Sequence, residues 1–142
     1  MTGVQTCALP ISTTPTHAWV WWVASPARIP KGAAKLIRHA VDGGERLLVS
    51  SISAWEVATL AARGRLELTM PVDVWISRAE SVPLFEFVPV DNRIAVRAVN
   101  LPGFPHRDPA DRLIVATALS AGATLITGDE RLRGYGPLAT AW

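Results

Sequence analysis

The sequence predicts an α/β fold, a three-layer α/β/α sandwich built on a central parallel sheet. Apolar residues make up 49% of the 142 residues and charged residues only 18%, which is typical of strands that are buried on both faces and read as continuous apolar runs. Segments with strand character also alternate with segments of helical spacing, an order that builds parallel sheets. At this length we expect one domain with a substantial core.

The first third of the chain predicts two helices and one strand. Residues 17–24 are rich in tryptophan and predict a short helix. Residues 29–41 carry apolar side chains at helical spacing, and Gly43 and Gly44 end the segment. Residues 47–49 form a short apolar run, which indicates a buried strand.

The next segments continue the alternation. Either Ser51 or Ser53 can cap a helix that runs to residue 62, and Gly64 fits its C-terminal stop. Residues 72–81 predict a further helix, and residues 85–90 predict a strand.

Two aspartates mark the starts of helices in the last third. Asp91 can cap a helix that runs to about residue 99. Asp108 precedes Pro109, and proline suits the first helical position because its missing N–H needs no partner there. This helix should run to residue 121 and end at Gly122. The remaining expectations are a loop at 101–107, a strand at 124–127, a short helical turn from 130, and a last short segment at 138–142.

Several acidic residues fall where predicted strands end. Glu56 follows the strand at 47–49, Asp129 follows the strand at 124–127, and Asp111 occupies the third position of the helix that Asp108 opens. Ligands bind at the carboxyl ends of strands in such sheets. Each acid also has a structural interpretation, since Glu56 could be an exposed helix residue and Asp108 and Asp129 could be helix caps. For Asp111 the two interpretations are evenly balanced.

Taken together, the three carboxylates predict a site for a hard divalent cation. Oxygen ligands suit magnesium or manganese rather than zinc or copper, and such a site is suited to hydrolysis of phosphodiesters. We expect the histidines to be surface or hydrogen-bonded residues rather than ligands: His17, His39 and His106. We expect the tryptophans to lie in the core or at a dimer interface rather than to stack on bases: Trp19, Trp21, Trp22 and Trp55.

Other function classes lack their sequence features. Cys7 is the only cysteine, which excludes an internal disulfide and a thiolate zinc site and favours a cytoplasmic protein. No uncharged apolar stretch is long enough to span a membrane. Glycine-rich phosphate loops and a nucleophile elbow are also missing. The net charge of +2 is compatible with a nucleic-acid partner.

From residue 16 onward the chain resembles the PIN-domain family, and within it the VapC-type toxins. Five motifs carry the resemblance, in the family's order and spacing: residues 16–22, 49–58, 64–68, 106–114 and 125–132.

The resemblance implies a PIN-like ribonuclease domain at 16–142, a magnesium-dependent (or manganese-dependent) endoribonuclease that is the toxin of a type II toxin–antitoxin pair. It implies that Glu56, Asp111 and Asp129 are the catalytic metal ligands and that Asp108 is an accessory residue. The implied partners are an RNA substrate such as tRNA and a cognate antitoxin. Nearby cations could steer the RNA backbone: Arg107, Arg112, Arg131 and Arg133.

The N-terminal segment departs from the family pattern. In the family, an apolar strand ends in a metal-binding aspartate just before the Thr-His pair, whereas Pro15 precedes that pair here. We therefore interpret residues 1–15 as a non-native or degraded segment, with residues 1–12 as foreign sequence fused to a truncated gene. The alternative function is a catalytically impaired PIN domain that binds RNA or antitoxin without cleaving. A third interpretation is a phosphatase or receiver-like domain. It would also need an aspartate at this position, so Pro15 counts against it too.

Two further expectations concern tryptophans. Trp19 and Trp22 should lie exposed on their helix and be hidden in a homodimer interface. The alternative is that both rings lie wholly in the core. Trp55 should be buried beside the active acid, so that its replacement by alanine costs several kcal/mol, on the order of 3–5.

Overall fold

A parallel sheet of five strands forms the centre of the computed structural model, which describes residues 7–8, 19–20, 23 and 25–142. The strands are ordered β3-β2-β1-β4-β5, and every neighbouring pair is parallel. The predicted α/β class is confirmed. The strands are β1 (Cys7–Ala8), β2 (Leu47–Ser50), β3 (Phe85–Val88), β4 (Thr124–Ile126) and β5 (Thr140–Ala141).

The helices lie where their caps and spacing predict them, within about two residues. A short 3-10 helix, η1 (Pro26–Arg28), precedes the first long helix. The α-helices that follow are α2 (Lys31–Asp42), α3 (Ser51–Ala62), α4 (Val72–Glu80), α5 (Asn92–Val99), α6 (Pro109–Ala121) and α7 (Glu130–Arg133). In the segment predicted as a helix at 17–24, residues 19, 20 and 23 are helical.

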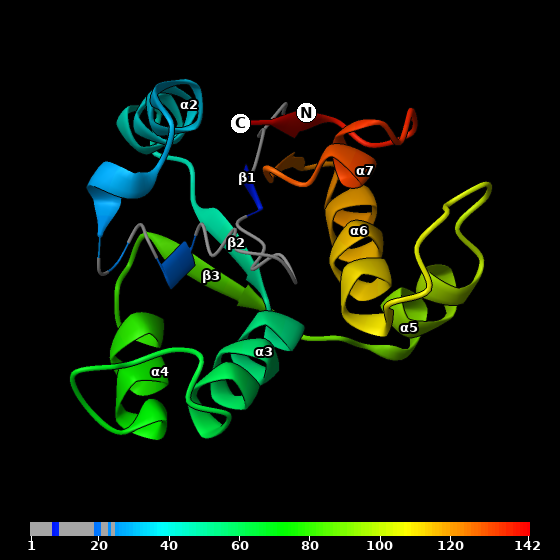
Figure 1. The fold of residues 1–142 in the computed structure, drawn as a ribbon. Helices are drawn as coiled ribbons and strands as arrows, with labels where there is room; N and C mark the ends of the chain where they lie inside the picture. Colours follow the sequence, from blue (N-terminus) through cyan, green and yellow to red (C-terminus); the bar gives the residue numbers. More distant parts are fainter. Residues whose placement is uncertain (1–6, 9–18, 21–22, 24) are drawn as a thin grey trace.

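Helices cover both faces of the sheet, so the predicted three layers are present (Figure 1). Alternate residues of β2 face opposite cores, as the pleat of a strand requires. Leu47 and Val49 pack with α2 and α4, whereas Leu48 packs with α6. In β4 the same alternation sends Ile126 to the first core and Leu125 to the second. β2 and β4 are therefore buried on two faces, which explains the high apolar content of the chain.

Gly122 ends α6 and turns the chain into β4. Its φ of 61° lies in the left-handed region, which glycine adopts without the steric cost of a Cβ. Its backbone N–H donates to the carbonyls of Ala118 and Leu119. This sharp turn lets α6 pack on the strand that follows it.

The N-terminal segment contributes the central strand β1. Cys7 pairs with Leu47 of β2 and with Thr124 of β4, and Ala8 pairs with the next residue of each strand. These two residues belong to the segment 1–15 that we interpret as non-native or degraded. The expected ligand-position residue Pro15 lies outside the described residues, as do His17, Trp21 and Trp22.

Two of the tryptophan expectations are wrong. Trp19 is not exposed: it is fully buried, and its ring packs edge-on against Trp75 at 5.0 Å and Phe87 at 5.4 Å. Trp55 is not buried, because it faces outward on α3 with 61% of its surface exposed. Trp19 therefore gives no support to a homodimer, and Trp55 contributes little to the core.

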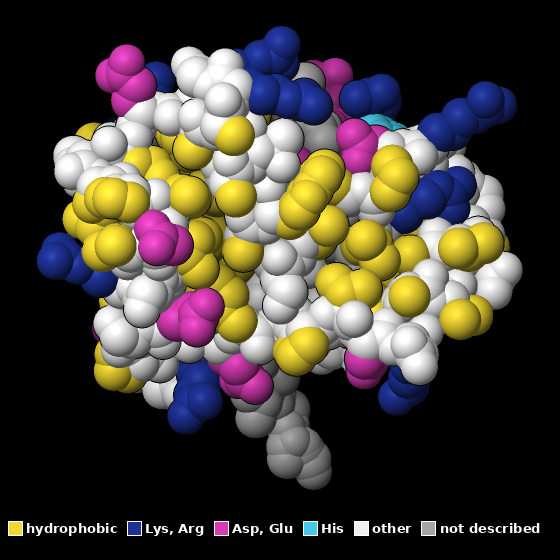
Figure 2. Space-filling model, turned by 90° about the horizontal axis from the view of Figure 1, so that it is seen from below, with side chains coloured by type: hydrophobic (Ala, Val, Ile, Leu, Met, Phe, Trp, Pro, Cys, Tyr) yellow, Lys and Arg dark blue, Asp and Glu magenta, His cyan; other side chains and the backbone are white. Residues whose placement is uncertain are grey.

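The face formed by α3, α4 and α5 carries exposed hydrophobic side chains among charged ones (Figure 2). Those on these three helices are Trp55, Val74, Val96 and Val99. Among the described residues, none of the helices is both long and apolar enough to cross a membrane.

We predict opposite stability effects for two tryptophans. Trp19→Ala should lower the free energy of unfolding by about 3–5 kcal/mol, because it empties a close-packed aromatic cluster. Trp55→Ala should change it by less than about 0.5 kcal/mol, as is usual for an exposed side chain. Urea unfolding followed by circular dichroism measures both. Equal losses in the two variants would contradict the assigned burial.

Candidate metal centre

The helix that carries Glu56 starts where β2 ends, without a connecting loop. Ser50 closes the strand and caps α3, and its hydroxyl accepts a hydrogen bond from the backbone N–H of Ile52 at 3.3 Å. The cap is thus one residue before Ser51 and three before Ser53, the two caps we expected. Glu56 lies in the second turn and is only 7% exposed. The interpretation of Glu56 as an exposed helix residue is therefore wrong.

Asp108 and Asp111 occupy the start of α6 as the sequence indicates. One oxygen of Asp108, Oδ1, accepts from the backbone N–H of Ala110 at 2.8 Å and from that of Asp111 at 3.3 Å. Asp108 is thus the helix cap, with Pro109 at the first helical position. Asp111 is 1% exposed and lies at the third position, which places its carboxylate at the carboxyl edge of the sheet.

Asp129 is fixed by the turn that follows β4. Its backbone N–H donates to the hydroxyl of the buried Thr127 at 3.1 Å, and its Oδ1 caps α7 by accepting from the backbone N–H of Arg131 at 2.9 Å. The other carboxylate oxygen, Oδ2, is buried and has no hydrogen-bond partner among the described residues. Oδ1 therefore caps the backbone of α7, and Oδ2 is available to a ligand.

The aspartates from α6 and from the end of β4 come together with a histidine. Single ligand atoms of His106, Asp111 and Asp129 all lie within 4.8 Å of one another, and all three residues are buried. Glu56 is close enough for its charge to interact with those of Asp111 and Asp108. The structure thus brings together the acids that the sequence places at strand ends.

Burial and like charge make ionisation of Glu56 and of Asp111 unfavourable. Burial raises the pKa of Glu56 to about 8, with the negative charges of Asp111 and Asp108 contributing in the same direction. The pKa of Asp111 is also raised, first by burial and then by Asp108. A buried Glu56 oxygen, Oε1, has no hydrogen-bond partner among the described residues. A cation between the carboxylates would offset both costs.

His106 is the site residue that the sequence analysis missed, because we expected a set without histidine. Its Nδ1 lies 3.0 Å from Oδ2 of Asp111, and its ring stacks on Phe104 at 5.2 Å. When Asp111 is ionised its carboxylate can only accept, so Nδ1–H is then the donor of this bond. Its position two residues before the Asp-Pro pair is a signal that could have placed it near the cluster.

The arginines around the site differ in what their guanidinium groups contact. Arg112 donates to three backbone carbonyls, those of His106, Ala98 and Phe104, and so holds the loop before α6. Arg107 and Arg131 are exposed. Nε of Arg131 lies 3.7 Å from Asp129. The Arg112 guanidinium is therefore engaged by backbone carbonyls, which distinguishes it from Arg107 and Arg131.

Comparison with known proteins gives one family. The PIN domain family matches residues 16–136 of the chain. The chain is 40% identical over 121 residues to Ribonuclease VapC22 of Mycobacterium tuberculosis, an alignment that covers 84% of this chain and 88% of that protein.

Solved structures share the fold at low sequence identity. VapBC2 of Rickettsia felis, bound to a DNA fragment from its promoter, matches with a TM-score of 0.67 and 13% identity, over 96% of this chain and 97% of that one. VapBC-1 of nontypeable Haemophilus influenzae matches with a TM-score of 0.61 and 18% identity, over 96% of each chain. At these identities the matches establish the three-layer fold.

We predict that Glu56 makes the metal-free protein less stable as the pH rises. Its folded-state pKa is raised, so its contribution to stability is fully present below its ordinary pKa of 4.5 and is lost as the pH rises through about 8. Glu56→Gln removes this loss. The stability difference between the variant and the parent should therefore grow between about pH 5 and pH 8, by at most about 1.4 kcal/mol for each pH unit.

The measurement is urea unfolding in EDTA at several pH values. Glu80→Gln, which changes an exposed acid on α4, is the matched control and should follow the parent. Parallel curves for Glu56→Gln and the parent would show that Glu56 ionises without hindrance in the folded protein.

Proposed function

The chain belongs to the PIN-domain family, and on that premise we propose that it is a metal-dependent endoribonuclease, the toxin of a type II toxin–antitoxin pair. The observation that carries the proposal is the convergence of buried carboxylates from α3, α6 and the end of β4 at one edge of a parallel sheet. The relative named a ribonuclease, 40% identical over most of this chain, supports RNA as the substrate.

The donor set fits a hard divalent cation, Mg²⁺ or Mn²⁺. Glu56, Asp111 and Asp129 would hold it through carboxylate oxygens, which these ions prefer. Two of those carboxylates have a buried oxygen without a hydrogen-bond partner among the described residues, Oε1 of Glu56 and Oδ2 of Asp129. When bound, the ion lowers the pKa of a coordinated water and neutralises phosphate oxygens, which is the chemistry that phosphodiester hydrolysis requires.

The neighbouring side chains would position these ligands. Nδ1–H of His106 holds one oxygen of Asp111, and hydrogen bonds of this kind orient metal-binding carboxylates. Asp108 fixes the start of α6 and lies at the mouth of the site, which suits an accessory role. Arg107 and Arg131 are exposed, and each is close in the sequence to one of the aspartates, Asp108 or Asp129. Both could contact the RNA backbone.

The proposed partners are an RNA such as tRNA and a cognate antitoxin, in the cytoplasm. The antitoxin is supported by the solved structures of the same fold, several of which are VapBC complexes, including one from Salmonella typhimurium bound to DNA. A homodimer also belongs to the proposal. Trp19 does not support the homodimer, because it is buried. Val96 and Val99 on α5 support it instead, because both are hydrophobic and exposed.

A second candidate function is a catalytically impaired PIN domain that binds RNA or antitoxin without cleaving. The observation that favours it is Pro15, which occupies the position where the family resemblance places a further ligand aspartate. Proline has no side-chain oxygen to offer a cation. If residues 1–15 are non-native, Pro15→Asp with an apolar strand restored before it should strengthen both metal binding and cleavage.

We predict that cleavage depends on Asp111 and Asp129 and not on the carboxylate charge of Asp108. Changing a neighbour of a metal ligand typically costs about 10–100-fold, so Asp111→Asn and Asp129→Asn should each lower kcat/KM by at least about 100-fold. Asp108→Asn should retain activity within a few-fold, because asparagine caps helices nearly as well as aspartate.

Cleavage is followed on a labelled RNA in Mn²⁺ and in EDTA, with folding checked by circular dichroism. Binding without cleavage by the parent chain would favour the impaired domain. Loss of activity in Asp108→Asn together with an active Asp111→Asn would show that the ligand and the cap are assigned the wrong way round.

A further inference from the structure

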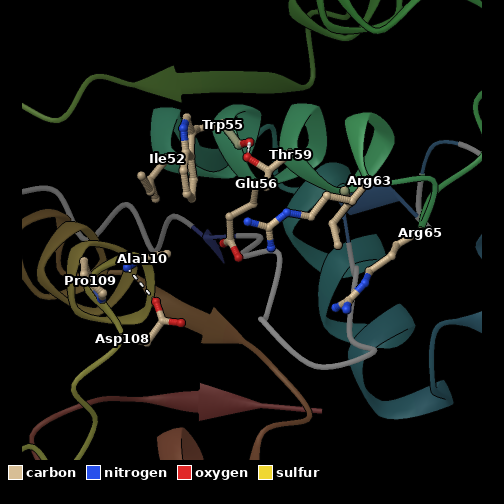
Figure 3. A pocket seen from close by; sticks show the side chains of 10 residues that line it. Ile52, Trp55, Glu56, Thr59, Arg63, Arg65, Asp108, Pro109 and Ala110 are labelled. Atoms are coloured by element: carbon tan, nitrogen blue, oxygen red, sulfur yellow. Dashed lines mark hydrogen bonds between the residues drawn. The ribbon is translucent and has the colours of Figure 1, made fainter.

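An exposed tryptophan stands directly beside the buried acid of α3. Trp55 precedes Glu56 in the sequence, yet 61% of its surface is exposed whereas Glu56 is 7% exposed. In Figure 3 the indole lies at one end of the pocket into which Glu56 points. A large exposed aromatic ring is costly to leave in water, so its position at the edge of a polar site suggests a ligand that covers it.

The pocket next to Trp55 is large enough for part of a nucleotide chain. It has a volume of about 540 Å³ and lies between α3 and the start of α6. Ile52 and Trp55 of α3 form apolar walls, and Asp108 and Pro109 at the start of α6 stand opposite. The pocket therefore joins an apolar stacking surface to the carboxylates of the proposed metal centre.

Two arginines also line this pocket. Arg63 and Arg65 follow the last turn of α3, and both are exposed. In Figure 3 the Arg63 side chain extends back toward Glu56, whereas Arg65 lies farther from the acids. Neither has an ion-pair partner in the part of the chain that the structure describes. Both guanidinium groups are therefore available to a phosphate.

We propose that Trp55, Arg63 and Arg65 form a subsite for an unpaired RNA segment, with a base stacked on the indole and a neighbouring phosphate held by the guanidinium groups. The proposal rests on the ribonuclease function proposed above and assigns three side chains to the binding of its substrate. A base can stack on a protein side chain only after it leaves its own helix, so the base on Trp55 comes from an unpaired segment.

Charge favours RNA over a second copy of the chain as the occupant. A cluster of acids repels a polyanion, and cations that line the same pocket compensate for that repulsion. The pocket is lined by two acids, Glu56 and Asp108, and by the two arginines. A ligand that carries both a phosphate and an apolar ring matches this lining, because Trp55 stands beside the charged groups.

The first test measures binding in EDTA, so that cleavage does not interfere. A labelled single-stranded RNA, long enough to cover one site of about eight nucleotides, is titrated with protein, and the same RNA paired with its complement is the comparison. Removing the partner of one stacked base costs about 1–3 kcal/mol, so Trp55→Ala should weaken single-strand binding by about 5–150-fold. Trp55→Phe should retain most of the affinity, and duplex binding should change little.

Arg63→Ala with Arg65→Ala tests the phosphate interaction. The double variant should bind the single strand more weakly, and the slope of log affinity against log salt should become shallower by about 0.7 for each phosphate that is no longer neutralised. Val74→Ala and Arg78→Ala are matched controls, since both residues are exposed on another helix, α4. They should bind as the parent does.

Unchanged affinity in Trp55→Ala would overturn the subsite, and so would an equal loss in Trp55→Phe. A change from dimer to monomer in Trp55→Ala by light scattering, with RNA affinity unchanged, would assign the indole to a protein interface instead.

The ribonuclease function is judged separately, by cleavage in Mn²⁺. A parent chain that fails to cleave but binds RNA through Trp55 would contradict that function and retain the subsite. Cleavage that is the same in Trp55→Ala as in the parent, with equal RNA affinity, would support the ribonuclease function and contradict the subsite.

Discussion

Burial of neighbouring carboxylates is the constraint on which the site depends. Glu56, Asp111 and Asp129 are each at most 8% exposed. Burial first, and then the negative charge of nearby acids, raises the pKa of Glu56 and of Asp111. A bound cation would offset this cost, so the same burial and repulsion that disfavour ionised Glu56 and Asp111 in the metal-free protein would be relieved by the metal.

The backbone holds the acids in place through short, capped transitions from strand to helix. Ser50 joins β2 to α3, Asp108 starts α6, and Thr127 fixes the turn that carries Asp129. Asp129 uses one carboxylate oxygen for its cap and leaves the other to the site. Because the acids are attached to rigid elements on both sides of the sheet, the geometry does not depend on a flexible loop.

Much of the fold could be predicted because its boundaries follow from local chemistry. Asp91, Asp108 and Gly122 cap helices through their own side chains or backbone conformation, and these effects are visible in the sequence. That the acids lie near one another could be predicted because strand ends of a parallel sheet meet at one edge. The burial of His106 and the exposure of Trp55 could not be predicted. His106 is buried against Phe104 and Trp55 faces solvent, and both outcomes depend on packing between distant segments.

Proton release on metal binding tests the central claim most directly. With a pKa of about 8, Glu56 is mostly protonated at about pH 7 in the metal-free protein, and a carboxylate must lose its proton to bind a cation. Calorimetric titration with Mn²⁺ at this pH, in buffers with different heats of ionisation, gives the number of protons released. The account predicts roughly one proton or more for each ion bound. Binding without proton release would contradict it, because the carboxylates would then be ionised before the metal arrives.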